Sequence, residues 1–232
     1  MGKTFEQIGL DHSLPFIAVV MEKRDAHEHP RYALPDGFSF SMFQAGDEER
    51  WAQLQLSVEH VSTLQEARDI FKREFLWNGV PCTDCVADVT QSPGYEKLRR
   101  RMLFVQDANG QLAATGALWT GDTFGDLRQR LHWIAVAPAY QGCGLSKAIV
   151  SKLLDLCTDL RHRYVYLTTQ TWSYKAIGVY TRFGFTPYMG TRPAHWPFKS
   201  AIPLPDYQAE NQMAWAIIDQ KLSAYKKEKA HD

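Results

Sequence analysis

A glycine-bearing turn between a predicted strand and a predicted helix could bind a phosphate group. In this 232-residue chain the apolar run Ile134–Val136 predicts a strand, which Pro138 would end because proline has no N–H for a sheet ladder. The turn Gln141–Gly144 follows, and apolar residues at three- and four-residue spacing predict a helix from Leu145. The first N–H groups of a helix lack partners within it, and glycine allows a close backbone approach, so a phosphate could lie there. A turn that merely connects two elements would contain the same glycines.

The four cysteines are a second set of residues with potential chemistry. Cys82 and Cys85 form a lone C-x-x-C, and no second pair or matching histidine pair stands near them. We therefore expect unpaired thiols in a loop, with a zinc site or a redox pair as alternatives. Cys143 lies in the glycine turn away from any base, and Cys157 falls on the predicted helix, where it would pack. The sequence predicts no metal site.

The overall composition excludes several classes of protein. Lys and Arg total 26, as do Asp and Glu, so no global basic field would attract nucleic acid. Hydrophobic residues make up 45% of the chain, enough for a core. The N-terminus lacks the pattern of a signal peptide, and the apolar stretch Leu14–Met21 is too short to cross a bilayer. We expect a cytoplasmic protein that binds neither nucleic acid nor a membrane.

The hydrophobic patterns predict a mixed α/β chain. In the first half we expect strands near 14–21 and 38–43, helices starting near 46 and 62–63, and a long loop over 77–94. Two strands joined by Asn109-Gly110 follow, then a strand ending at Val136, a helix to about 161, a strand at 164–169, a helix at 173–183 and a strand from 185. The last part would be an irregular proline-rich stretch over 190–207 and a final helix over about 206–227. The basic run Lys97–Arg101 is expected to be a solvated approach to a strand, with an anion contact as the alternative.

We expect these elements to fall into three segments of the chain. Residues 1–37 read as an N-terminal extension with an extra strand, and residues 38–190 form the core. Residues 191–232 add the irregular segment and an amphipathic helix, which we expect to pack on the same domain.

Two motifs make the chain similar to a known family. The stretch Gln141–Ser146 fits the pattern [Q/R]-x-x-G-x-[G/A], except that Ser146 replaces Gly or Ala. The stretch Ala176–Phe185 fits A-x-x-x-Y-x-x-x-G-F, with Tyr180 as its tyrosine and with Gly184 at the position that would cap the helix. With both motifs in this order, the chain resembles the GNAT superfamily of acyl-CoA-dependent N-acyltransferases. Ser173 stands where this family often has asparagine.

The resemblance implies a fold and a cofactor. The fold would be a mostly antiparallel sheet of six to seven strands, splayed between the fourth and fifth core strands, with helices on both faces. The N–H of Ile134 would polarise the thioester of acetyl-CoA and stabilise the charge that develops on its oxygen, and Val136 would pair with the pantetheine arm. The implied cofactor-binding residues are Ile134, Ala135, Val136, Gln141, Gly142, Cys143, Gly144, Leu145, Ser146 and Ser173.

The resemblance also implies two catalytic roles. Tyr180 would protonate the leaving thiolate, since a thiol pKa of about 8.5 lies near tyrosine's pKa of about 10; packing on the inner face of its helix is the alternative. His132 is two residues before Ile134 and so lies on the same face of the strand. It would act as the general base through water. A structural or substrate-contacting histidine is the alternative, and a glutamate or bulk water could replace it as the base.

These inferences predict an acetyl-CoA-dependent N-acetyltransferase, which acetylates the amine of a small molecule by direct attack in a ternary complex. Aromatic residues in segments 62–95 and 188–207 would select the amine, with ordinary packing as the alternative. One alternative is a regulatory or partner-binding module that binds acyl-CoA without turnover. A dinucleotide-binding oxidoreductase fits poorly, because Lys147 stands where G-x-G-x-x-G needs its third glycine. The acceptor, the acyl chain length and a homodimer formed through the extra termini stay open.

Overall fold

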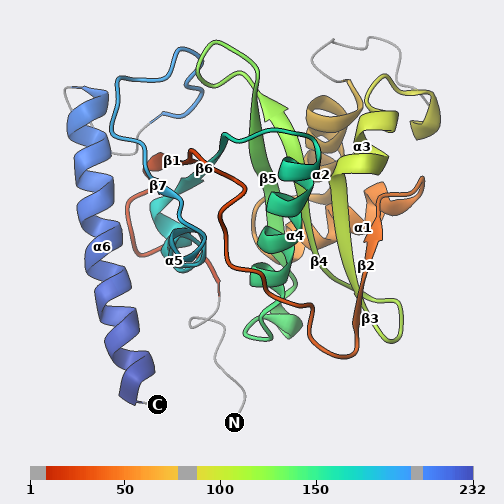
Figure 1. Cartoon of the computed structure of the whole chain (residues 1–232), viewed down its shortest axis with the longest axis horizontal. Coiled ribbons are helices and arrows are strands. Elements are labelled where there is room, and N and C mark those ends of the chain that lie inside the picture. Colours follow the sequence, from red (N-terminus) through yellow and green to blue (C-terminus); the bar gives the residue numbers. More distant parts are fainter. Residues whose placement is uncertain (1–8, 78–87, 200–205, 232) are drawn as a thin grey trace. The chain divides into compact units, whose positions relative to one another are not determined.

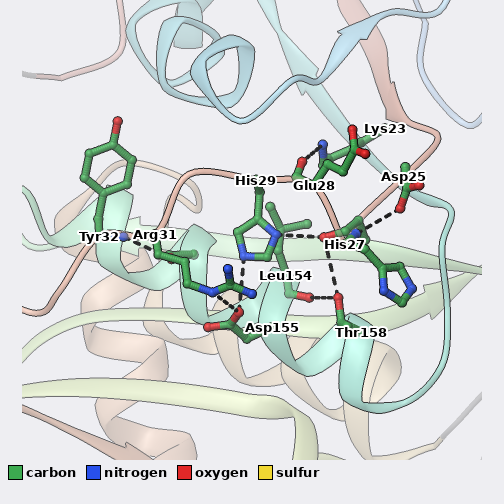
Figure 2. A network of polar contacts seen from close by, with 12 residues as sticks. Lys23, Asp25, His27, Glu28, His29, Arg31, Tyr32, Leu154, Asp155 and Thr158 are labelled. Carbon is green, nitrogen blue, oxygen red and sulfur yellow. Dashed lines mark hydrogen bonds and ion pairs between the residues drawn. The ribbon is translucent and has the colours of Figure 1, made fainter.

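The computed structural model describes residues 9–77, 88–199 and 206–231 of the chain (Figure 1). Its strands are β1 (Ala18–Lys23), β2 (Phe38–Met42), β3 (Met102–Asp107), β4 (Leu112–Gly121), β5 (Arg128–Val136), β6 (Val165–Gln170) and β7 (Thr186–Pro187). Its α-helices are α1 (Asp47–Ser57), α2 (Leu64–Phe71), α3 (Tyr95–Arg101), α4 (Leu145–Asp159), α5 (Tyr174–Arg182) and α6 (Tyr207–His231). Most of the predicted elements are therefore present.

The strands form one sheet of seven, in the order β2-β3-β4-β5-β6-β1-β7. The pairs β2–β3, β3–β4, β6–β1 and β1–β7 are antiparallel. Strands β5 and β6 are parallel, and the register places Arg130 opposite Tyr166. This mostly antiparallel sheet with one parallel pair confirms the predicted mixed α/β fold class.

The described chain divides into two compact units. The first unit contains residues up to Arg31, Trp119–His132 and the residues from Leu154 onward. The second unit contains Tyr32–Leu118 and Trp133–Leu153. Strands β4 and β5 and helix α4 are continuous elements with residues in both units.

An aromatic core holds the second unit together. Trp51 of α1 is fully buried, and its ring lies 5.1 Å from that of Phe71 and 5.7 Å from that of Phe75. Helix α2 begins after Thr63, whose side chain accepts a hydrogen bond from the N–H of Glu66 and satisfies one of the orphan donors of the first turn. A chain of five π-helical residues, Lys72–Leu76, carries Phe75 into this core.

The β3–β4 hairpin confirms the predicted Asn-Gly turn. Gly110 has a φ of 78°, which glycine adopts without steric cost. The Asp107 carboxylate accepts hydrogen bonds from the N–H groups of Asn109 and Gln111 and closes the turn. This hairpin leads β4 into the centre of the sheet.

Helix α3 was not predicted, because the basic run at its end suggested an approach to a strand. The helix forms because Leu98 is fully buried and Glu96 pairs with Arg99 at a distance of 2.9 Å, one turn along the same face. Gly94 precedes it and donates its N–H to the carbonyl of Leu76. A Cβ at Gly94 would lie 1.7 Å from the Phe75 carbonyl oxygen, so only glycine fits this junction.

Strand β1 is an internal strand of the first unit. It pairs with β6 on one side, where Val20 lies opposite Thr168, and with β7 on the other, where Glu22 lies opposite Thr186. The N-terminal segment thus contributes a strand between two strands from late in the chain. The division of the chain at residue 37 stays a prediction.

The C-terminal helix α6 packs against α5 and β1 within the first unit (Figure 1). Asp206 caps its first turn by accepting a hydrogen bond from the N–H of Ala209. Buried Asn211 donates to the carbonyl of Tyr188 and accepts from the indole of Trp215. None of the helices in the described ranges combines the length and apolar character needed to span a lipid bilayer.

Candidate functional site

The turn after β5 has the backbone that the glycine pattern predicts. Gly142 and Gly144 have φ values of 85° and 88°, a region that favours glycine. The Gln141 side chain donates to the carbonyl of Val136 at 3.0 Å and ties the turn back to the strand end. A Cβ at Gly144 would meet no heavy atom within 4 Å, so the backbone conformation, rather than close packing, is what demands glycine.

The first turn of α4 follows directly and suits an anion. The carbonyl of Gly144 accepts from Lys147 and Ala148, which starts the helix. The N–H groups of Leu145 and Ser146 have no acceptor within the helix because of their position in its first turn. This turn carries no acidic residue, so nothing in it repels a phosphate.

Cys143 differs from its neighbours in the turn. Its N–H already donates to the carbonyl of Tyr140, at 3.4 Å, and its side chain is exposed. Cys157, in contrast, is buried, as its predicted packing role requires. Cys82 and Cys85 lie outside the described residues.

Strand β5 contains a backbone distortion, at Trp133, that the sequence does not predict. Trp133 has a φ of 49°, in the left-handed region, although it stands between strand residues and carries a bulky side chain. Its ring lies 5.3 Å from that of Trp51, and its carbonyl oxygen lies 3.4 Å from the side-chain nitrogen of Gln55. No local sequence signal marks this distortion, because tryptophan ordinarily favours regular strands.

The predicted backbone contacts Ile134, Ala135 and Val136 follow Trp133 directly, with Ala135 buried and the other two half-buried. They lie in the second unit with the glycine turn. His132, Ser173 and Tyr180 belong to the first unit.

His132 is paired with Arg130 on the same strand. The guanidinium Nη2 lies 2.9 Å from His132 Nε2. A guanidinium can only donate, so Nε2 accepts and the neutral imidazole carries its proton on Nδ1. The lone pair that a base acting through Nε2 would use is therefore engaged by Arg130. Arg130 thus affects whether His132 can act as a base, although the spacing of residues in the sequence did not point to it.

Tyr180 lies on the buried face of α5. Its side chain is 9% exposed, with its ring 6.1 Å from Phe185. Burial raises the pKa of Tyr180 to about 12, because the charged phenolate loses its hydration. The hydroxyl therefore stays protonated across the neutral range and is available as a donor. Gly184, with a φ of 80°, ends the helix as predicted.

Ser173 immediately precedes α5. Its hydroxyl oxygen accepts a hydrogen bond from the side chain of Gln170 at 3.0 Å. The hydroxyl is shorter than the amide that the resembled family often has there, so its reach toward a ligand is smaller. Its role as a cofactor contact stays a prediction.

The aromatic residues expected to select an amine range from fully buried to half-buried. Phe75 is fully buried in the core of the second unit, which agrees with the packing alternative. In the first unit the Tyr188 ring lies 5.0 Å from Phe124, and the Trp196 ring lies 5.0 Å from Phe198.

Within the described ranges, no group of three or more His, Cys, Asp or Glu residues could hold a metal ion.

The comparisons with known proteins agree with the two motifs. The model of the acetyltransferase (GNAT) family matches residues 64–185, more than half of the chain. No curated protein matches the sequence.

Two solved structures resemble the fold. The first is a GCN5-related N-acetyltransferase from Sphaerobacter thermophilus, with a TM-score of 0.56 and 16% identity over 79% of this chain and 51% of that one. The second is a GNAT-family acetyltransferase from Colwellia psychrerythraea, with a TM-score of 0.51 and 12% identity over 74% of this chain and 53% of that one. The chain thus spans about half the length of these two proteins, and at these identities the likeness concerns the fold alone.

Proposed function

The chain belongs to the GNAT family of acetyltransferases, and from this premise we propose that it transfers an acetyl group from acetyl-CoA to the amine of a small molecule. The observation that carries the proposal is the turn at Gly142 and Gly144, which leads directly into a first helical turn without acidic residues. Bound acetyl-CoA would supply the acetyl group as a reactive thioester.

The residues after β5 would hold the pyrophosphate. The N–H groups of Gly144, Leu145 and Ser146 are the donors, and the dipole of the fifteen-residue helix α4 adds partial positive charge at this end. The open space beside Gly144 leaves room for the ligand to approach the backbone. Cys143 contributes less than its neighbours, because its N–H already has an acceptor in Tyr140.

The strand before the turn would orient the pantetheine arm and the thioester. Val136 pairs with an amide of the arm. The N–H of Ile134 donates to the thioester carbonyl oxygen, where negative charge develops as the amine attacks. A fixed backbone donor is effective here because it needs no reorganisation during the reaction.

Tyr180 and His132 would move the protons. Tyr180 would donate its hydroxyl proton to the departing sulfur as negative charge develops there. Its raised pKa keeps the phenol protonated at neutral pH but also makes it a weaker acid than an unperturbed tyrosine. His132 accepts a proton from the amine through water, after its Nε2 exchanges the bond from Arg130 for one from that water. The amine attacks the thioester directly, without an acyl-enzyme.

A non-catalytic acyl-CoA-binding module is the second candidate function. The feature that favours it is the Arg130–His132 pair, which engages the lone pair that a base would need. Such a module would bind CoA through the same turn and would show no turnover with any amine.

The test combines binding and turnover. Acetyl-CoA affinity is measured by calorimetry, and release of the CoA thiol is followed over a panel of small amines. We expect amine-dependent thiol release in the wild type. In Tyr180→Phe, which keeps the ring, turnover should fall about 100-fold or more with CoA affinity nearly unchanged.

Three outcomes would count against parts of this proposal. Unchanged turnover in Tyr180→Phe would remove Tyr180 as the acid. CoA binding without turnover on any amine would favour the module, and absence of CoA binding would overturn both candidates.

A further inference from the structure

The left-handed backbone at Trp133 requires a physical support. A residue with a Cβ pays a steric cost at positive φ, and a bulky side chain inside a strand makes such a conformation exceptional. Such conformations persist only where the surrounding structure determines them. The neighbours of Trp133 in the second unit should therefore reveal what holds it.

Gln55 of helix α1 holds the backbone. Its side chain is fully buried, and its Nε2 lies 3.4 Å from the carbonyl oxygen of Trp133. A carbonyl oxygen can only accept, so the Gln55 amide must present its NH₂ group to Trp133. The amide oxygen then faces the other way, toward His60.

His60 fixes that amide orientation. Its Nδ1 lies 2.7 Å from Gln55 Oε1, and since that oxygen only accepts, Nδ1 must carry a proton and donate it. Burial lowers the pKa of His60 to about 4, so the ring is neutral at physiological pH and its tautomer is set by this bond. The order of donation is therefore His60 to Gln55 to Trp133.

The side chain of Trp133 is held as well. Its ring lies 5.3 Å from that of Trp51 and 6.1 Å from that of His60, so one ring from α1 and one from the segment after it pack near it. Helix α1 thus carries both Trp51 and Gln55, which contact the ring and the carbonyl of one residue. The support is independent of the residues next to Trp133 along the chain.

Holding the carbonyl of Trp133 also directs the next N–H. The carbonyl of residue 133 and the N–H of residue 134 belong to one planar peptide unit, which is trans, so they point in opposite directions. When Gln55 holds the oxygen on its side, the N–H of Ile134 must point to the opposite side. The orientation of this donor is therefore set from α1.

We propose that Gln55 and His60 are positioning residues, which aim the Ile134 N–H at the thioester carbonyl of acetyl-CoA. This inference rests on the proposed function, in which Ile134 supplies that donor. Neither residue touches substrate in this proposal; both act through the peptide unit between Trp133 and Ile134. Their loss should therefore weaken polarisation of the carbonyl while leaving the phosphate turn intact.

The experiment uses the full chain and an unreactive methyl-ketone analogue of acetyl-CoA, labelled with carbon-13 at the ketone carbonyl. A hydrogen bond to that oxygen moves the carbon-13 resonance downfield, which reads the donor without any turnover. Three variants are compared with the wild type: Gln55→Met, His60→Leu and His60→Asn. Gln55→Met removes the donor to Trp133 and His60→Leu removes the donor to Gln55. His60→Asn keeps a donor near the position of Nδ1.

In the wild type we expect a downfield shift on binding. In Gln55→Met and His60→Leu the resonance should return toward its solution position, and kcat should fall about 10- to 100-fold with the KM for acetyl-CoA nearly unchanged. His60→Asn should recover most of both signals. Thermal unfolding of each variant identifies those that fail to fold. If His60→Leu fails to fold, His60→Asn, which keeps the donor to Gln55, is compared with the wild type and with Gln55→Met.

The outcomes separate the two levels of the proposal. A wild-type shift that survives in Gln55→Met, or equal loss in His60→Leu and His60→Asn, would overturn the positioning role and leave the acetyltransferase intact. No binding of the analogue by the wild type would overturn the proposed function and this inference with it.

Discussion

Two left-handed backbone sites in the same strand–turn–helix stretch are built in opposite ways. At Gly142 and Gly144 the absent Cβ makes the conformation inexpensive, and nothing within 4 Å would contact a Cβ at Gly144. At Trp133 a bulky residue takes up a similar φ and depends on Gln55, His60 and a ring contact with Trp51. The turn is therefore a property of its own residues, whereas the distortion in the strand is a property of packing from elsewhere in the second unit.

The largest effect is expected when Trp133→Ala and Trp133→Gly are compared. Both lose the ring contacts of a half-buried tryptophan, so each should lower the free energy of unfolding by about 3 kcal/mol, the low end for truncation of a tryptophan. Glycine in a strand is ordinarily less stable than alanine by about 0.5–1 kcal/mol, but at a φ of 49° the order should reverse. Urea denaturation of both variants measures the difference. Alanine more stable than glycine would mean that the strain is absent in solution.

The second test is the pH dependence of stability through His60. Burial lowers the pKa of His60 from 6.5 to about 4 in the folded protein. As the pH falls from 6.5 toward 4, the unfolded chain binds a proton that the folded chain excludes, so stability falls by at most about 1.4 kcal/mol per pH unit. Below about pH 4 both states bind the proton, and this contribution no longer changes. His60→Asn should flatten the slope between pH 4 and 6.5, and an unaltered slope would assign it to other groups.

The glycine turn is tested by Gly144→Ala, with Gly144→Asn as the matched control. The Cβ meets no neighbour, so the cost is the left-handed φ alone, about 1 kcal/mol. If the turn opens instead to relieve that strain, acetyl-CoA affinity should fall by about tenfold or less. Asparagine tolerates this region better, so Gly144→Asn should retain more affinity in calorimetry. Equal losses in the two variants would indicate that side-chain bulk at the ligand, and not backbone conformation, is the cause.

The smallest effect is expected for Gln141→Met. It removes the side-chain hydrogen bond to the Val136 carbonyl but keeps the length of the side chain. One such bond contributes about 0.5–1.5 kcal/mol, so CoA affinity should fall by a few-fold while the unfolding midpoint moves little. A loss larger than that for Gly144→Ala would show that the turn depends on this tie more than on its glycines.

The same contrast explains what the sequence could predict. The glycine turn, the Asn109-Gly110 hairpin and the end of α5 at Gly184 depend on local backbone preferences, so the pattern predicts them correctly. The distortion at Trp133 and the pairing of Arg130 with His132 depend on contacts that no spacing rule describes. The two motifs therefore could not predict how the Trp133 distortion and the Arg130–His132 pair affect the proposed site.

Two parts of the fold were missed for related reasons. Helix α3 forms because Leu98 finds a buried place and Glu96 pairs with Arg99, whereas the basic run by itself suggested only a solvated segment. The position of β1 within the sheet, and not at its edge, follows from pairing with β6 and β7, strands from late in the chain. Hydrophobic alternation predicts a strand but says nothing about its partners.

The internal position of β1 has a consequence for how the molecule is made. Ala18 lies opposite Gln170, so β1 leaves the ribosome well before the strand β6 with which it pairs. Contacts between such distant parts of a chain slow folding, because the loop between them must be closed before they contribute. During that interval the apolar residues Val19, Val20 and Met21, which are fully buried at the end, would be exposed to other chains. Aggregation during synthesis is then the hazard that this arrangement carries.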